Sequence, residues 1–179
     1  MSGFSVDWLR LRAPFDRAAR DAALARRFAA ALPRAPGRPL RLIDLGAGTG
    51  ANARALAPLI SRDQDWLLED HDAALLGWQA AETLAWAARE GYRAEKNAGA
   101  VVVATDAVRW RFSGRRIDLA NELDRCLDGP CDGITMAALA DLTSALWVDA
   151  LATRLRRRRV PLLAVIAVDG RRLWHPAAP

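Results

Sequence analysis

The sequence is poor in the residues that build metal and disulfide sites. Its 179 residues include only 2 cysteines, Cys126 and Cys131, and only 2 histidines, His71 and His175. The two cysteines lack the spacing of a zinc site, and a site made mainly of imidazole needs more histidine than this. We therefore expect no bound metal, and free thiols in a cytoplasmic setting.

The sequence also lacks the signals of export and of membrane insertion. No apolar run approaches the ~18 residues that would span a bilayer. The segment 1–14 does not have the basic region followed by an apolar region that marks a signal peptide. We expect a cytoplasmic protein without membrane association.

Positive charge is present in excess but is confined to one place. The formal net charge is +5, and Arg154 and the run 156–159 supply five arginines, without which the rest of the chain has a formal charge of zero. Such a run typically ends a helix, where cations offset the macrodipole, and the alternative is a docking site for an anionic partner. Because the charge is not spread over a surface, we do not expect nucleic acid as a partner.

The composition, 52% hydrophobic and 26% charged, is that of one ordinary globular domain. Short apolar runs alternate with stretches of helical periodicity, which predicts a doubly wound, mostly parallel α/β sheet. We expect a single domain over 1–179. Its N-terminal helical cap and linker cover 1–39, and its α/β core covers 40–179.

The predicted elements follow this alternation along the chain. The predicted strands are 40–45, 66–68, 101–112 as strand or hairpin, 115–119 after a turn at Ser113 and Gly114, 132–136 and 161–168. The predicted helices are 16–32, 51–60, 73–89, 121–127 and 138–155. Ligands of such sheets bind beyond the carboxyl ends of the strands, so the chemistry is expected there.

A glycine-rich turn follows the first predicted strand. Residues 44–50 read D-x-G-x-G-x-G, and glycines at alternate positions let a backbone approach a ligand closely. Gly46, Gly48 and Ala51 also satisfy the dinucleotide fingerprint G-x-G-x-x-G/A. Asp44 favours a different cofactor, because its carboxylate can accept hydrogen bonds from an ammonium group, whereas an anionic pyrophosphate gains nothing from it.

Residues 42–56, LIDLGAGTGANARAL, resemble the first motif of class I S-adenosylmethionine-dependent methyltransferases. The resemblance implies a Rossmann-like fold, S-adenosylmethionine as cofactor and methyl transfer to a small-molecule acceptor. No catalytic residue is predicted. The cofactor-binding residues that it implies are Asp44, Gly46, Ala47, Gly48, Gly50, Asn52, Asp70, His71, Asp118, Leu119 and Met136.

The family's pattern gives some of these residues a specific role. Asp70 is expected at the ribose hydroxyls, with Asp72 as the alternative if the second strand runs longer, and Asp118 with the amide of Leu119 is expected at the adenine. Arg17 or Arg20 is a candidate for the methionine carboxylate. The sequence lacks an Asn or Asp followed by two prolines and an aromatic residue, which weighs against methylation of nucleic-acid bases.

The sequence departs from the family at its end. The family's sheet has seven strands, with a final antiparallel hairpin beside the fifth. If 101–112 is an inserted hairpin, the predicted strand 161–168 corresponds to the family's fifth, and this sequence stops just after it. We therefore expect a core without the C-terminal strands, whose apolar edge at 162–168 promotes self-association. Two other functions stay open, a non-catalytic cofactor-binding or scaffold module and a NAD(P)-dependent oxidoreductase.

Overall fold

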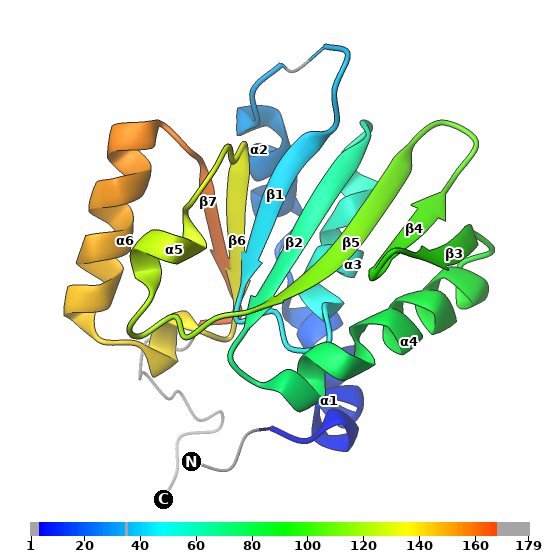
Figure 1. The fold of residues 1–179 in the computed structure, drawn as a ribbon, viewed down its shortest axis with the longest axis horizontal. Helices are drawn as coiled ribbons and strands as arrows, with labels where there is room; N and C mark the ends of the chain where they lie inside the picture. The colour runs from blue at the N-terminus through cyan, green and yellow to red at the C-terminus, as the bar shows by residue number, and fades with distance from the viewer. Residues whose placement is uncertain (1–3, 35, 168–179) are drawn as a thin grey trace, which may run out of the picture.

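The computed structural model describes residues 4–34 and 36–167, which form a seven-stranded sheet covered by helices (Figure 1). The strand order is β3-β4-β5-β2-β1-β6-β7. The five strands from β5 to β7 run parallel, and β3 and β4 are antiparallel additions at one edge. The predicted doubly wound, mostly parallel α/β fold is confirmed.

The elements have the following bounds. The strands are β1 (Leu40–Leu45), β2 (Gln64–Asp70), β3 (Arg93–Asn97), β4 (Ala100–Ala104), β5 (Arg109–Arg116), β6 (Gly133–Ala137) and β7 (Leu162–Val165). The α-helices are α1 (Val6–Ala19), α2 (Ala22–Ala31), α3 (Ala51–Leu56), α4 (Ala73–Arg89), α5 (Leu123–Cys126) and α6 (Ala145–Arg158). Two 3₁₀ turns, η1 (Ala57–Leu59) and η2 (Ala140–Leu142), complete the set.

Helices cover both faces of the sheet and give it two separate cores. Side chains of α2, α3 and α4 pack on one face, together with Leu42 and Trp66 of the sheet. Those of α5 and α6 pack on the other face, together with Ile43 and Ile134. Successive residues of a strand point to opposite faces, which explains why Leu42 and Ile43 belong to different cores. In the described part of the chain, no helix has the length and apolarity needed to cross a bilayer.

The predicted single helix over 16–32 is wrong, because the chain forms two helices there. Arg20 has an extended backbone (ψ 126°) and ends α1. The Asp21 carboxylate then accepts hydrogen bonds from the amides of Ala23 and Leu24, which caps α2 at its N-terminus. Most of the chain before residue 16, for which no helix was predicted, belongs to α1 (Val6–Ala19).

The predicted turn at Ser113 and Gly114 is also wrong. Both residues lie within β5, where they pair with Leu67 and Leu68 of β2. The chain turns instead at 105–108, where the Thr105 hydroxyl accepts hydrogen bonds from two backbone amides. The third parallel strand is therefore 109–116, and Asp118 follows its end.

The antiparallel pair lies at the opposite edge from the one that the family's pattern implies. The hairpin of β3 and β4 extends the sheet beside β5, and β7 is the last strand at the other edge. β7 is shorter than predicted, because Ile166 takes a positive φ of 56° directly after it. The end of the predicted strand, Val168, lies outside the described residues. Among the residues described, no strand pairs with the outer side of β7.

Candidate functional site

The glycine loop between β1 and α3 has the backbone that its glycines predict. Gly46, Gly48 and Gly50 have φ angles of +63°, +53° and +84°. A Cβ atom on Gly46 would lie 3.1 Å from a methyl of Leu139, and one on Gly50 would lie 2.9 Å from a methyl of Leu68. Conformation and space therefore both favour glycine at these positions.

Asp70 holds this loop from the neighbouring strand. It is the last residue of β2, and its Oδ2 accepts a hydrogen bond of 2.8 Å from the amide of Gly48, while Oδ1 accepts one from the amide of Asp72. Asp72 instead caps α4, since its carboxylate accepts from the amides of Ala74 and Leu75. The structure thus places Asp70, and not Asp72, beside the glycine loop.

Asp44 is fully buried. It belongs to a series of hydrogen-bonded side chains that links Arg20, at the end of α1, to Thr135 of β6. Its Oδ1 accepts hydrogen bonds of 2.6 Å from Asn52 Nδ2 and from the Thr135 hydroxyl, and Asn52 Oδ1 accepts from Arg20 Nη1. Among the described residues, Asp44 Oδ2 has no hydrogen-bond partner. Burial raises the pKa of Asp44 from its ordinary 3.8 to about 6, although the two hydrogen bonds oppose this shift.

The residues after β5 form a local turn. Asp118 is exposed, and its carboxylate accepts hydrogen bonds from the amide of Ala120 and from the side chain of Asn121. The Asn121 hydrogen bond is the main reason why the pKa of Asp118 lies below its ordinary value. His71, at the end of β2, is exposed too, with Nδ1 3.4 Å from Asp70 Oδ1.

Leu119 and Met136 pack against the core on the α5 and α6 side. The Leu119 carbonyl accepts a hydrogen bond of 2.7 Å from Trp147 Nε1, while its amide donates none within residues 4–34 and 36–167. Met136 is buried with Ile43 and Ile134. The amide of Leu119 thus has no acceptor among the described residues, whereas the Met136 side chain is buried in the core.

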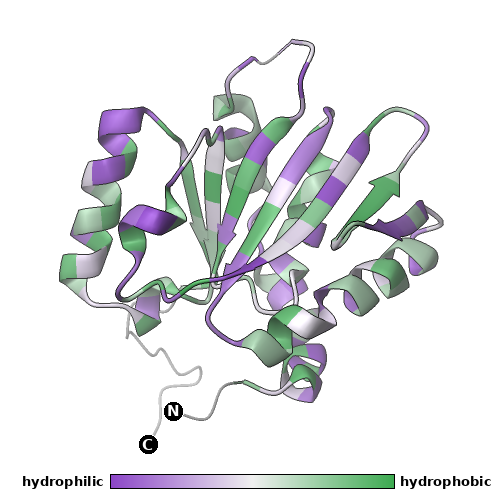
Figure 2. Cartoon of the chain, in the orientation of Figure 1, coloured by the Kyte–Doolittle hydropathy of each residue, from purple (hydrophilic) through white to green (hydrophobic). Residues whose placement is uncertain are grey.

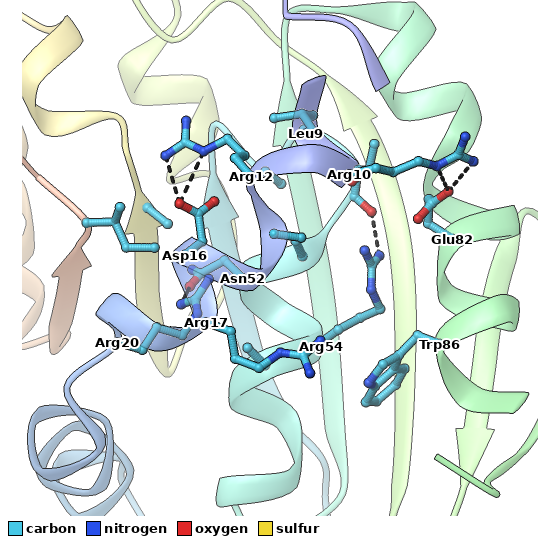
Figure 3. A pocket seen from close by; sticks show the side chains of 18 of the residues that line it. Leu9, Arg10, Arg12, Asp16, Arg17, Arg20, Asn52, Arg54, Glu82 and Trp86 are labelled. Atoms are coloured by element: carbon cyan, nitrogen blue, oxygen red, sulfur yellow. Dashed lines mark hydrogen bonds and ion pairs between the residues drawn. The ribbon is translucent and has the colours of Figure 1, made fainter. Parts of the chain in front are cut away.

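A cleft of about 730 Å³ opens between α1, α3 and α4, over the glycine loop (Figure 3). Of the eleven implied cofactor-binding residues, Gly46, Ala47, Gly48 and Asn52 line it, and so do the two arginine candidates, Arg17 and Arg20. The others, Asp44, Gly50, Asp70, His71, Asp118, Leu119 and Met136, do not line it. The predicted site is therefore divided between this cleft and the adjoining carboxyl ends of β2 and β5.

Two buried polar side chains support the loop although they belong to no motif of the sequence. Gln79 of α4 donates a hydrogen bond of 2.9 Å to the carbonyl of Gly48, and its amide fills the space that a Cβ on Gly114 would need. Arg54 of α3 donates to the carbonyl of Thr49 and to the Thr83 hydroxyl. Polar residues at 79 and 83, one helical turn apart on the buried face of α4, are the signal that was available.

Two of the four described non-glycine residues with a positive φ lie at this cleft. Ala138 and Ile166, which follow β6 and β7, have positive φ angles of 51° and 56°, and both line the cleft. Such angles are unfavourable for residues other than glycine, above all for a β-branched one, and strain of this kind tends to gather at functional sites. Among the described residues, no group of three or more His, Cys, Asp or Glu side chains is arranged to hold a metal ion.

Comparisons with known proteins find only distant likenesses. No protein-family model matches the chain, and no curated protein matches it. Among solved structures, a ribosomal protein L11 methylase from Lactobacillus delbrueckii subsp. bulgaricus is 20% identical with a TM-score of 0.40, over 74% of this chain and 51% of that one.

Two further solved structures show the same level of similarity. An arsenic (III) S-adenosylmethionine methyltransferase from Chlamydomonas reinhardtii is 18% identical with a TM-score of 0.40, over 73% of this chain and 40% of that one. The large terminase of a thermophilic bacteriophage is 12% identical with a TM-score of 0.41, over 79% and 37%. This chain spans about half or less of each, and likenesses at this level assign no activity.

Proposed function

We propose that the chain binds S-adenosylmethionine at the carboxyl edge of its sheet and transfers the methyl group to a small molecule. The observation that carries the proposal is the position of Asp70. Its carboxylate lies at the end of β2, hydrogen-bonded to the glycine loop that follows the neighbouring strand β1. A fixed acid beside a glycine loop is the arrangement that a cofactor with a ribose diol requires.

The residues present fit this cofactor at three points. Asp70 is oriented by two backbone amides, and its oxygens keep lone pairs for two ribose hydroxyls. The unpartnered Asp44 Oδ2 supplies negative charge near the loop for an ammonium group. The free amide of Leu119, beyond the next strand, is a donor for a ring nitrogen.

When bound, S-adenosylmethionine supplies an electrophilic methyl group on a sulfonium. The chain's own contribution is position and exclusion of water, which are the main requirements of an in-line transfer. Helix α1 lies over the loop, so that a Cβ on Gly48 would be 3.4 Å from a methyl of Leu9. The remaining task of the side chains in the cleft is to hold the methyl acceptor against the loop. No residue is assigned as a general base.

The test is calorimetric titration with S-adenosylhomocysteine. We expect Asp70→Asn to weaken binding by about 1.5 to 3 kcal/mol, the usual range for hydrogen bonds to a charged group. Asp72→Asn is the matched control, because it removes the same charge two residues away and leaves a good helix cap, so the affinity should stay unchanged. Equal losses in both variants, or binding of NADH in place of S-adenosylhomocysteine, would contradict the proposal.

A second measurement separates transfer from binding alone. Incubation with radiolabelled S-adenosylmethionine and a panel of small acceptors should give labelled product that is lost in Asp70→Asn. Cofactor affinity without any turnover would favour a non-catalytic binding module instead.

A further inference from the structure

The cleft over the glycine loop is lined by more positive than negative side chains. Three acidic residues, Asp16, Glu82 and Glu90, face a larger number of arginines. The arginines that line the cleft are Arg10, Arg12, Arg17, Arg20, Arg54 and Arg89. Six guanidinium groups against three carboxylates leave an excess of three positive charges in one concave site.

Within residues 4–34 and 36–167, the carboxylates of the cleft form close ion pairs with two of these arginines. Arg10 Nη2 lies 2.6 Å from Glu82 Oε1, and Arg12 Nη2 lies 2.9 Å from Asp16 Oδ1. Glu90 is exposed at the end of α4 and forms no ion pair with a described residue. Within residues 4–34 and 36–167, the other four arginines, Arg17, Arg20, Arg54 and Arg89, have no carboxylate within 4.0 Å.

Arg54 is the most unusual of the four, because it is 8% exposed. Only its Nη1 donates hydrogen bonds to described residues, and the acceptors are a carbonyl and a hydroxyl without net charge. Burial lowers the pKa of Arg54 to about 10; the nearby carboxylate of Glu82 opposes this shift, and the charge of Arg89 adds to it. A buried guanidinium that no carboxylate contacts directly is costly, and an anion bound in the cleft would offset that cost.

Figure 3 shows the Arg54 side chain between Arg17 of α1 and Trp86 of α4. These residues come from three helices and converge on one part of the cleft. Guanidinium groups match the geometry of phosphate and carboxylate oxygens, and several of them around one oxyanion give a strong and specific site.

We propose that the cleft binds a small molecule that carries an oxyanion, a phosphate or a carboxylate, and that Arg17, Arg54 and Arg89 contact this group. The glycine loop lines the same cleft, so the other end of the molecule reaches the loop. If the loop binds S-adenosylmethionine, a step that rests on the function proposed above, the anionic molecule is the methyl acceptor. A small ligand fits better than a nucleic acid, because the burial of Arg54 keeps a polymer backbone away from it.

The probes for this site are inorganic pyrophosphate and citrate, titrated calorimetrically into the full chain. We expect saturable binding of at least one of them, and the tighter of the two identifies phosphate or carboxylate as the group. Arg89→Gln should weaken this binding by about tenfold or more, as expected for a charge-assisted hydrogen bond. Because Arg89 is exposed, its replacement leaves the core intact, whereas Arg54→Met also tests folding.

Arg157→Gln is the matched control, since it removes the same charge from an exposed residue of α6, on the opposite face of the sheet. It should leave binding of both probes unchanged, and Arg89→Gln should leave the affinity for S-adenosylhomocysteine unchanged. Failure of this proposal is thus separable from failure of the cofactor site. Three outcomes would overturn it: no saturable binding of either anion, equal losses in Arg89→Gln and Arg157→Gln, or tighter binding of a single-stranded oligonucleotide than of either probe.

Discussion

At the scale of single residues, the buried carboxylate of Asp44 makes the stability of the protein depend on pH. Its folded pKa of about 6 lies above its ordinary value of 3.8, so the folded state holds an additional proton between these two values. The stability that this group contributes is therefore present below pH 4 and is lost as the pH rises to 6.

We expect Asp44→Asn to remove this loss, so that the variant gains stability relative to the natural chain from pH 4 to pH 6. The gain should be on the order of 3 kcal/mol, from about two pKa units at ~1.4 kcal/mol each. Denaturation with urea at a series of pH values measures the difference between the two proteins. A constant difference across this range would mean that Asp44 titrates normally in the folded protein.

Glu69 and Arg115 form an ion pair on the other face of the sheet. Glu69 is fully buried, and Arg115 Nε lies 2.9 Å from Glu69 Oε1. Burial raises the pKa of Glu69 even with this partner. Arg115→Met should therefore cost about 3 kcal/mol of unfolding free energy, because a buried carboxylate is left unpaired.

The double variant Glu69→Gln/Arg115→Met should recover most of this loss, as urea denaturation at pH 8 would show. If the double variant is no more stable than Arg115→Met, the cost comes from lost packing of the arginine and not from the unpaired charge.

The position of Asp70 beside the glycine loop could be predicted from the sequence, whereas two residues that support the loop could not, for a physical reason. Asp70 was predicted because strand ends and glycine loops leave a strong local pattern, and the structure places it against the Gly48 amide. Gln79 and Arg54 act through contacts with residues far along the chain, which no local pattern records. A buried polar residue on an apolar helix face is the only trace that such contacts leave in a sequence.

At the scale of elements, the first parallel strand and the longest helix were predicted at both ends because each has a clear periodicity. The predicted 40–45 and 73–89 match β1 and α4 at both ends. β3 was missed because its residues are almost all polar, as Figure 2 shows. An edge strand needs little burial and is protected from aggregation by charge, so its sequence resembles a loop.

The hairpin of β3 and β4 contains a strained residue that offers a direct test. Its two-residue loop is Ala98 and Gly99, with φ angles of 44° and 78°, an arrangement in which asparagine followed by glycine is preferred. Ala98→Asn should raise the free energy of unfolding by about 0.5 to 1 kcal/mol, since asparagine tolerates this backbone better than alanine.

Thermal and urea denaturation of Ala98→Asn would measure the gain. Ala107→Asn, in the exposed turn between β4 and β5, is the control and should give no increase. A loss of stability in Ala98→Asn would show that the hairpin does not hold this turn in solution.

At the scale of the whole molecule, the sheet has two very different edges. The β3 edge is polar, whereas β7 presents the apolar Leu162, which is 38% exposed. We expect the chain to self-associate through β7, because an apolar edge strand is a template for pairing. Sedimentation at increasing concentration should show association, and Leu162→Lys should weaken it.

A lysine substitution in β3 would make a poor control, because that edge is already polar. The control is therefore Leu146→Lys, which places the same charge elsewhere on the surface. Leu146 is 81% exposed on α6, away from the strand, and its replacement should leave association unchanged. A monomer at all concentrations would contradict the expectation for the edge.

The position of β1 in the middle of the sheet has a consequence for synthesis. β1 pairs with β2 early in the chain but with β6 only much later, as the hydrogen bond between Asp44 and Thr135, 91 residues apart, illustrates. A ribosome releases the N-terminal part first, so β1 has one unpaired side until β6 emerges. The nascent chain therefore carries one unpaired side of a central strand through much of translation, and during that interval this side is open to non-native pairing.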